Sequence, residues 1–299
     1  MTGGTRGAQG PGDARGGGPG AGGGPGPGDA SRGGPGPESV RPRVWAVREP
    51  PPWGEALSLS LLDAGEERTF LSFRRAADRS RYLTAHTALR LLLAAHLACR
   101  PADVALGREP CARCGGPHGR PVVLGRGGGP HFSLSHAPGL SLVAIAGVPV
   151  GVDADRVPGP RTVELCLRRL HPQERRDAAA VPEGELSRWF CRLWTRKEAW
   201  LKACGTGLGR GLDRDYLGER EGPGALPGPA GWIVRNLSCG VLDATHAAAL
   251  AVPEGTPVPA APRDLDWHDV RSRAGGWPAG DGRREVGGGR TADGRRRTD

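Results

Sequence analysis

The sequence predicts an α+β domain, because helical and strand-like segments adjoin one another in two successive stretches of the chain. Apolar residues recur at helical spacing over 80–99 and over 185–204. Shorter segments that alternate or run apolar predict strands at 131–136, 140–146, 150–155, 231–237 and 246–252. Helices and strands in this order are typical of the α+β class.

Composition limits this domain to the middle of the chain. The 299 residues include 51 Gly and 29 Pro, and residues 1–43 alone contain 17 Gly and 7 Pro. We therefore expect a disordered Gly/Pro-rich leader over 1–43 and, where apolar residues again become sparse, a disordered Arg/Gly-rich tail over 253–299. The rest has the length of two halves of about 100 residues each, which we place at 44–150 and 151–252.

The predicted elements begin with a helix at Asp63, whose side chain can cap it while Glu66 reaches back to the Asp63 amide. In the longer helix that follows, Arg81 and Arg90 lie off the apolar stripe. Residues 107–130 are rich in Gly, Pro and Cys and therefore predict a loop.

Charge and apolar runs argue against several classes of function. The formal net charge is +9, but no Lys/Arg run is interleaved with aromatics, so we do not expect a nucleic-acid partner. The longest apolar run, Leu140–Val152, contains Ser, Gly and Pro, and the leader lacks the apolar core of a signal peptide, so we expect no membrane contact. We expect the seven Cys to be free thiols in a monomeric, cytoplasmic protein.

Lysine is almost absent from this chain. Of 41 basic residues 39 are Arg, as a G+C-rich genome favours, and the two lysines, Lys197 and Lys202, lie five residues apart. Arg and Lys differ most where a compact point charge is needed. The two lysines therefore mark positions that a guanidinium does not serve.

The helix of 185–204 carries both lysines. Lys197 falls in the middle of its apolar stripe and must pair or extend its amine to water. Glu198 and Lys202 stand at i and i+4 on the edge of that stripe. An ordinary surface salt bridge is the alternative for this pair, but the scarcity of lysine favours a functional role.

Two acidic residues lie in the second half of the strand predicted at 150–155. Asp153 and Asp155 are two residues apart, so both carboxylates project to the same side of an extended backbone. Like charges side by side need a cation, and a set of oxygen ligands suits Mg²⁺. A solvated strand end is the alternative interpretation.

Ser135 and His136 end the strand at 131–136. Adjacent strand residues point to opposite faces, so we do not expect a nucleophile–base pair. Their hydroxyl and imidazole could instead meet phosphate oxygens, and a pair that caps the following turn is an equally good interpretation.

Three potential zinc ligands lie in the loop of 107–130. Cys111, Cys114 and His118 have plausible ligand spacing, but no fourth ligand is nearby in the sequence. A Gly/Pro-rich loop with free thiols is the alternative, and the sequence leaves both open.

Taken together, these motifs resemble those of the 4′-phosphopantetheinyl transferases, in particular the long two-halved, surfactin-synthetase-activating type. Residues 151–155, G-V-D-A-D, are similar to the family's G-[VI]-D-x-[ED], and residues 194–205 to its W-x-x-K-E-[AS]-x-x-K-x-x-G in the W/KEA form. The resemblance covers about 44–252. Shorter likenesses, to the family's G-K-P, F-[NS]-[IL]-S-H and G-x-G-L elements, lie at 119–121, 132–136 and 206–208.

The resemblance implies two similar α/β halves related by a pseudo-twofold, with coenzyme A between them. It implies Mg²⁺-dependent transfer of 4′-phosphopantetheine from coenzyme A to a serine of an acyl or peptidyl carrier protein, releasing adenosine 3′,5′-bisphosphate. Glu198 would take the serine proton and Lys202 would neutralise the leaving phosphate. The implied metal ligands are Asp153, Asp155 and Glu198, and the implied coenzyme A contacts are Arg81, Arg120, Ser135, His136 and Lys202.

Two positions depart from the family pattern. Asp155 stands where Glu is frequent, and its shorter side chain could place a water between it and the metal. Arg120 replaces the usual lysine, as the composition of this chain predicts. Two other functions stay open, namely a metal-dependent phosphohydrolase with the same acids and a nucleic-acid-binding protein with Arg/Gly tails.

Overall fold

Helices and strands are mixed along the chain in the computed structural model, which describes residues 41–48, 59–125, 129–218 and 228–268. The α-helices in these ranges are α2 (Ala64–Ser72), α3 (Ala76–Leu97), α4 (Pro160–Leu167), α5 (Pro172–Ala179) and α6 (Glu183–Cys204). The strands are β1 (Arg43–Arg48), β2 (Leu106–Arg108), β3 (Pro121–Val123), β4 (His131–Ala137), β5 (Leu140–Ala146), β6 (Gly151–Arg156), β7 (Trp232–Leu237), β8 (His246–Pro253) and β9 (Arg263–Asp264). This mixture is consistent with the predicted α+β class.

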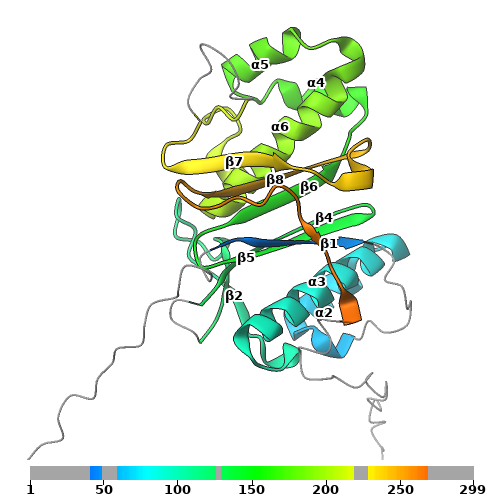
Figure 1. Ribbon diagram of the computed structural model, residues 1–299, viewed down its shortest axis with the longest axis vertical. Helices are drawn as coiled ribbons and strands as arrows, with labels where there is room; N and C mark the ends of the chain where they lie inside the picture. Colours follow the sequence, from blue (N-terminus) through cyan, green and yellow to red (C-terminus); the bar gives the residue numbers. More distant parts are fainter. Residues whose placement is uncertain (1–40, 49–58, 126–128, 219–227, 269–299) are drawn as a thin grey trace, which may run out of the picture. The chain divides into compact units, whose positions relative to one another are not determined.

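Two sheets lie face to face between two long helices (Figure 1). The first has the strand order β4-β5-β1-β9, in which β5 pairs antiparallel with both β4 and β1. The second has the order β6-β8-β7 and is antiparallel throughout. Helix α3 covers the outer face of the first sheet and α6 covers that of the second (Figure 1). The short ribbon of β2 and β3 stands beside these layers.

Strand β5 explains the layering, because its apolar run is buried on both faces. Val143 and Ile145 belong to the core cluster that includes Leu89 of α3. Leu142, on the opposite face, belongs to the cluster that includes Leu250 of the second sheet. A strand covered on both faces needs apolar side chains at nearly every position, and in β5 only Ser141 departs from this.

Hydroxyl groups join the two sheets along β4. The amide of Val152 donates to Ser133 Oγ at 3.0 Å, and the amide of Ala154 donates to Ser135 Oγ at 3.1 Å. The two serines are two residues apart on β4 and therefore point to the same side. Their hydrogen bonds hold β6 beside β4 and bring the acidic end of β6 to the junction of the sheets.

Helix α6 approaches β6 closely at Gly151. A Cβ atom on this residue would overlap the carbonyl oxygen of Ala199 and would lie 2.6 Å from the Ala203 nitrogen. Only glycine permits such an approach of two backbones. The first residue of the G-V-D motif therefore sets the distance between the strand and the helix that carry the acidic residues.

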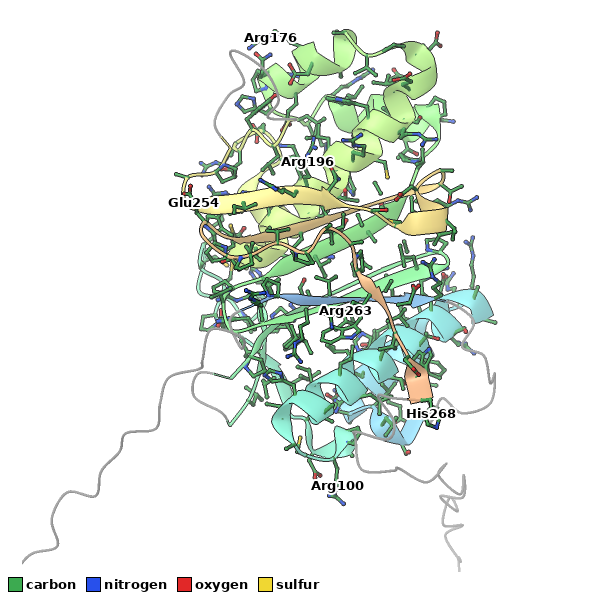
Figure 2. All side chains as sticks on the ribbon, in the orientation of Figure 1. Arg100, Arg176, Arg196, Glu254, Arg263 and His268 are labelled. Carbon is green, nitrogen blue, oxygen red and sulfur yellow. The ribbon has the colours of Figure 1, made fainter. Side chains whose placement is uncertain are left out.

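The fold continues beyond residue 252, so the predicted start of the tail at 253 is wrong. Strand β9 pairs parallel with β1, and the Leu265 amide donates to the Ala46 carbonyl at 2.8 Å. Trp267 is 5% exposed in the core beneath the first sheet. Figure 2 shows Arg263 on β9 and His268 on the α3 side of that sheet. The sequence indicated this last strand only weakly, because Leu265 and Trp267 stand among polar residues.

Other boundaries differ less. The predicted loop over 107–130 contains β3 and most of β2, which are too short to show a period, and β1 was not predicted as a strand. Arg90, placed off the apolar stripe of α3 by its spacing, is instead 1% exposed. Residues 1–40 and 269–299 lie outside the described ranges. Of the helices in the described part of the chain, none has both the length and the apolar character that a membrane crossing needs.

Candidate active site

Asp153 lies at the junction of the two sheets and is 6% exposed. Its Oδ1 atom accepts from Ser135 Oγ at 2.8 Å and from Lys202 Nζ at 2.7 Å. Lys202 also donates to the carbonyls of Leu134 and Val152, at 3.3 and 3.2 Å. Strand β4, strand β6 and helix α6 therefore meet at one carboxylate and one ammonium group.

Asp155 and Glu198 border the same space. A cavity of about 370 Å³ is lined by Leu134, Ser135, His136, Asp153, Ala154, Asp155, Trp194, Glu198 and Lys202. Burial and then the charge of Asp153 raise the pKa of Glu198. Burial, and more weakly the charge of Asp153, raise the pKa of Asp155. Three carboxylates thus share a cavity in which the charge of Asp153 makes it harder to ionise Asp155 and Glu198.

The chemistry of this donor set fits a divalent cation. All three acidic side chains offer oxygen, and a cation would relieve the repulsion that raises the pKa values of Asp155 and Glu198. Lys202 is the positive group that contacts Asp153 here. The three acids line one cavity without forming a cluster whose ligand atoms all lie within 4.8 Å of one another; in the described ranges only Cys111, Cys114 and His118 form one.

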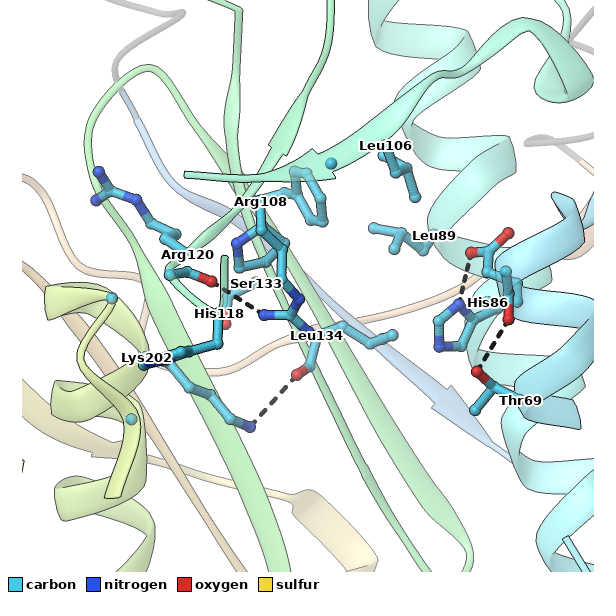
Figure 3. A pocket seen from close by; sticks show the side chains of 18 of the residues that line it. Thr69, His86, Leu89, Leu106, Arg108, His118, Arg120, Ser133, Leu134 and Lys202 are labelled. Carbon is cyan, nitrogen blue, oxygen red and sulfur yellow. Dashed lines mark hydrogen bonds and ion pairs between the residues drawn. The ribbon is translucent and has the colours of Figure 1, made fainter. Parts of the chain in front are cut away.

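A second cavity, of about 700 Å³, adjoins the first. Leu134, His136 and Lys202 line both, so Lys202 stands where they meet. Figure 3 shows one wall with Arg108, His118, Arg120 and Ser133 and the opposite wall with Thr69 and His86. The smaller, acidic cavity therefore continues into a space large enough for an extended ligand with basic groups along its wall.

The part of the chain that carries this site is similar to known proteins. A family model described as the 4′-phosphopantetheinyl transferase superfamily matches residues 149–225, which include β6 and α6. A putative 4′-phosphopantetheinyl transferase of Synechocystis sp. is 32% identical over 158 residues, which are 52% of this chain and 61% of that protein. The region of β6 and α6 therefore matches the 4′-phosphopantetheinyl transferase superfamily.

Other relatives of this superfamily align over similar lengths. A 4′-phosphopantetheinyl transferase of Bacillus subtilis is 29% identical over 157 residues, covering 51% of this chain and 69% of that protein. The transferase HetI of Nostoc sp. is 28% identical over 178 residues, covering 58% and 71%. The chain thus matches about three fifths of the first relative and somewhat more of these two.

Both motifs that carry the superfamily resemblance lie at the smaller cavity. Asp153 and Asp155 come from β6, and Glu198 and Lys202 lie one turn apart on α6. The direct partner of Lys202 is Asp153, whereas the sequence paired it with Glu198. The sequence missed this contact because it joins residues 49 positions apart, beyond any helical or strand period.

The remaining predicted residues take different places. Arg120 lines the larger cavity and donates to the Ala203 carbonyl at 3.2 Å and to Glu109 at 2.9 Å. The desolvation of His136, with the charges of His86, Lys202 and Arg81, lowers its pKa. Arg81 donates to Asp78 at 3.1 Å and does not line either of these two cavities.

A buried network missed by the sequence supports the wall of the larger cavity. Glu66 Oε2 accepts from Arg90 at 2.6 Å, and Glu66 Oε1 lies 2.7 Å from His86 Nδ1. The capping box predicted at Asp63 is confirmed, and Asp63 also accepts from Arg90 at 2.7 Å. Burial raises the pKa of Glu66, but hydrogen bonds from His86 and the Asp63 amide and the charge of Arg90 overcome this and leave it lowered. The spacing of α3 gave no signal for this network, because it placed Arg90 off the apolar stripe.

Lys197 is buried as its place in the apolar stripe predicted, at 2% exposure. Its Nζ atom lies 2.8 Å from Glu174 Oε2 and donates to the carbonyls of Leu212 and Asp215, at 2.7 and 2.8 Å. Glu174 is 0% exposed and also accepts from the Leu217 amide. All three protons of Lys197 therefore find oxygen, away from the two cavities.

Proposed function

We propose that this protein transfers the 4′-phosphopantetheine arm of coenzyme A to a serine of an acyl or peptidyl carrier protein. The match of residues 149–225 to the superfamily supports this, as do relatives named for that transfer. The observation that carries the proposal is the meeting of Asp153, Glu198 and Lys202 in a small cavity that continues into a larger one.

The proposed reaction exchanges one phosphorus–oxygen bond for another. The serine oxygen bonds to the phosphorus that carries pantetheine, the pyrophosphate bond breaks, and its electron pair leaves with adenosine 3′,5′-bisphosphate. Such transfers depend on positioning and on charge neutralisation. We assign the serine proton to Glu198, whose carboxylate lines the smaller cavity beside Asp153. We assign the leaving phosphate to Lys202, at the junction of the cavities.

Mg²⁺ fits the oxygen donors of the smaller cavity. Asp153, Asp155 and Glu198 would hold it, and it would lower the repulsion between the pyrophosphate and the incoming oxygen. The Ser135 hydroxyl donates to Asp153 at 2.8 Å and would orient that carboxylate toward the ion. We therefore assign Ser135 to the support of Asp153 first, and to contact with phosphate only in addition. Arg120 and His136, which line the larger cavity, would serve the 3′-phosphate and adenosine side of coenzyme A, whereas Arg81 lines neither cavity.

We further propose that the two halves are related by a pseudo-twofold. Each pairs an antiparallel sheet with one long helix, α3 on β4-β5-β1 and α6 on β6-β8-β7. The larger cavity lies between them, lined by residues of both. We also propose that the protein is a monomer and that it works in the cytoplasm. Its seven free cysteines support the second of these proposals.

The acceptor distinguishes this function from a phosphohydrolase that uses the same acids. The full chain would be incubated with coenzyme A and Mg²⁺, with and without a panel of apo carrier proteins, and adenosine 3′,5′-bisphosphate would be measured. We expect release only when an apo carrier is present. Equal release without a carrier would assign water as the acceptor and contradict the proposal.

A further inference from the structure

The loop between β2 and β3 gathers three soft or borderline metal ligands. Cys111, Cys114 and His118 each offer one ligand atom, and these atoms all lie within 4.8 Å of one another. Cys114 Sγ is 3.0 Å from His118 Nε2. All seven cysteines are free, so no disulfide occupies either thiol. The transfer reaction proposed above uses none of these side chains.

The backbone of the loop is wrapped around the first cysteine. The Cys111 amide donates to the Gly116 carbonyl, and the Gly115 amide donates to the Cys111 carbonyl, both at 2.8 Å. The turn therefore fixes the backbone of Cys111 close to Cys114 and His118.

Glycine makes this turn possible. Gly115 has φ +72°, a backbone conformation that other residues rarely adopt. A Cβ atom on Gly116 would lie 3.1 Å from His118 Nε2 and 3.4 Å from Cys114 Sγ. The loop thus turns Cys114 and His118 toward each other and leaves the space beside them clear.

We propose that Cys111, Cys114 and His118 bind one Zn²⁺ ion, with a fourth coordination position open to water. Zinc takes two thiolates and an imidazole at about 2.3 and 2.1 Å, which sets their tetrahedral separations at about 3.6–3.8 Å. The present arrangement reaches these with small movements. Two thiolates balance the charge of the ion, and soft sulfur disfavours Mg²⁺ or Ca²⁺.

The fourth position is open because no further His or Cys joins this group within the described ranges. Every His and Cys of the sequence lies within those ranges. Cys111 is buried, whereas Cys114 and His118 are exposed, so the ion would meet solvent on one side. Water is the ligand that fits this side.

The proposed ion would stiffen one wall of the larger cavity. His118 and Arg120 both line it, and Arg120 is anchored to the end of α6 through the Ala203 carbonyl. The Gly119 amide donates to the Glu109 carbonyl, which closes the base of the loop. Zinc at its other end would leave the segment little freedom to move.

The first test measures metal in the full chain without an affinity tag. We expect about one Zn²⁺ per chain of wild type. In Cys114→Ser and in His118→Gln we expect the affinity for Zn²⁺ to fall by about tenfold or more. Both are exposed positions, so these variants should fold. Cys166→Ser, which removes a thiol outside the group, should keep the metal. Co²⁺ substituted for Zn²⁺ should give the intense visible and sulfur charge-transfer bands of a tetrahedral thiolate site.

Wild-type chain that binds no Zn²⁺ when the ion is supplied under reducing conditions would overturn the proposal. Metal content equal in wild type and Cys114→Ser would do the same. A second arm rests on the proposed function: zinc-free protein should bind coenzyme A more weakly than zinc-loaded protein. If both forms bind it equally, zinc does not shape the cavity; if neither binds it, the proposed function fails while the metal result stands.

Discussion

At the scale of single residues, arginine in place of either lysine of α6 should have a different effect at each position. Lys197→Arg must fit a wider group among the oxygens of Glu174, Leu212 and Asp215, and should lower the free energy of unfolding by about 1–3 kcal/mol. Lys202→Arg should spare stability and lower kcat/KM for coenzyme A. Melting curves and kinetics on both variants test this. If neither variant differs from wild type, the clustering of lysines has no physical cause.

The same two lysines show what the sequence could and could not predict. Their rarity marked both, and the apolar stripe of α6 predicted that Lys197 would be buried and paired. Its partner Glu174 was not predictable, because α5 and α6 meet only in the folded chain. Lys202 was assigned to Glu198 by helical spacing, yet it contacts Asp153 of β6.

Glu66 should make stability depend on acid pH. Its folded pKa is lowered, so the unfolded chain binds the proton more tightly, and the stabilisation is present above the unfolded pKa and is lost as pH falls through the folded value. Glu66→Gln should cost about 2–3 kcal/mol near neutral pH and flatten this part of the pH profile. Urea unfolding at several pH values measures it. The exposed neighbour variant Glu67→Gln should match wild type; a similar loss there would refute a specific role.

At the scale of elements, long periodic segments were predictable and short or shared ones were not. The strands β4 and β5 and helix α6 follow from alternation, an apolar run and a helical stripe. Strand β9 has two residues, which is too few for any period, and it depends on β1 for its hydrogen bonds. The role of Ser135 also depends on another element, because its hydroxyl faces β6.

The contact of β6 with α6 should tolerate no side chain at Gly151. Gly151→Ala places a methyl group against the Ala199 carbonyl, and should cost about 3 kcal/mol or more because two backbones must move apart. Gly184→Ala, in the first turn of α6 with nothing within 4 Å, should instead gain about 0.5–1 kcal/mol. Chemical unfolding compares the two. Equal stability of both variants would mean that the close approach is not a constraint.

At the scale of the whole molecule, the sequence predicted the two stretches of helix and strand but not how the chain ends. After β8 in the second sheet, the chain returns to the first sheet and inserts Trp267 beneath it. Composition indicated a tail from residue 253, since two large apolar residues in a polar segment resemble disorder. The two residues become part of the fold only because they pack against the core around α3.

Truncation should locate the end of the fold. A chain that ends at 268 should unfold with the same free energy as the full chain, whereas one that ends at 262 loses β9 and Trp267 and should lose about 3–5 kcal/mol. Trp267→Ala in the full chain should reproduce most of that loss. Melting temperatures of the four proteins decide it. Equal stability of the 262 and 268 chains would restore the earlier boundary.

The intact mass of an apo carrier protein, incubated with coenzyme A and Mg²⁺, tests the central claim most directly. The wild-type chain should add the mass of one phosphopantetheine arm to the carrier serine. Glu198→Gln should slow this by about 10²-fold while its melting temperature stays near that of wild type. Glu185→Gln, an exposed change on the same helix, should act as wild type. A carrier left unmodified by wild type, or modified equally fast by Glu198→Gln, would contradict the assignment of this site.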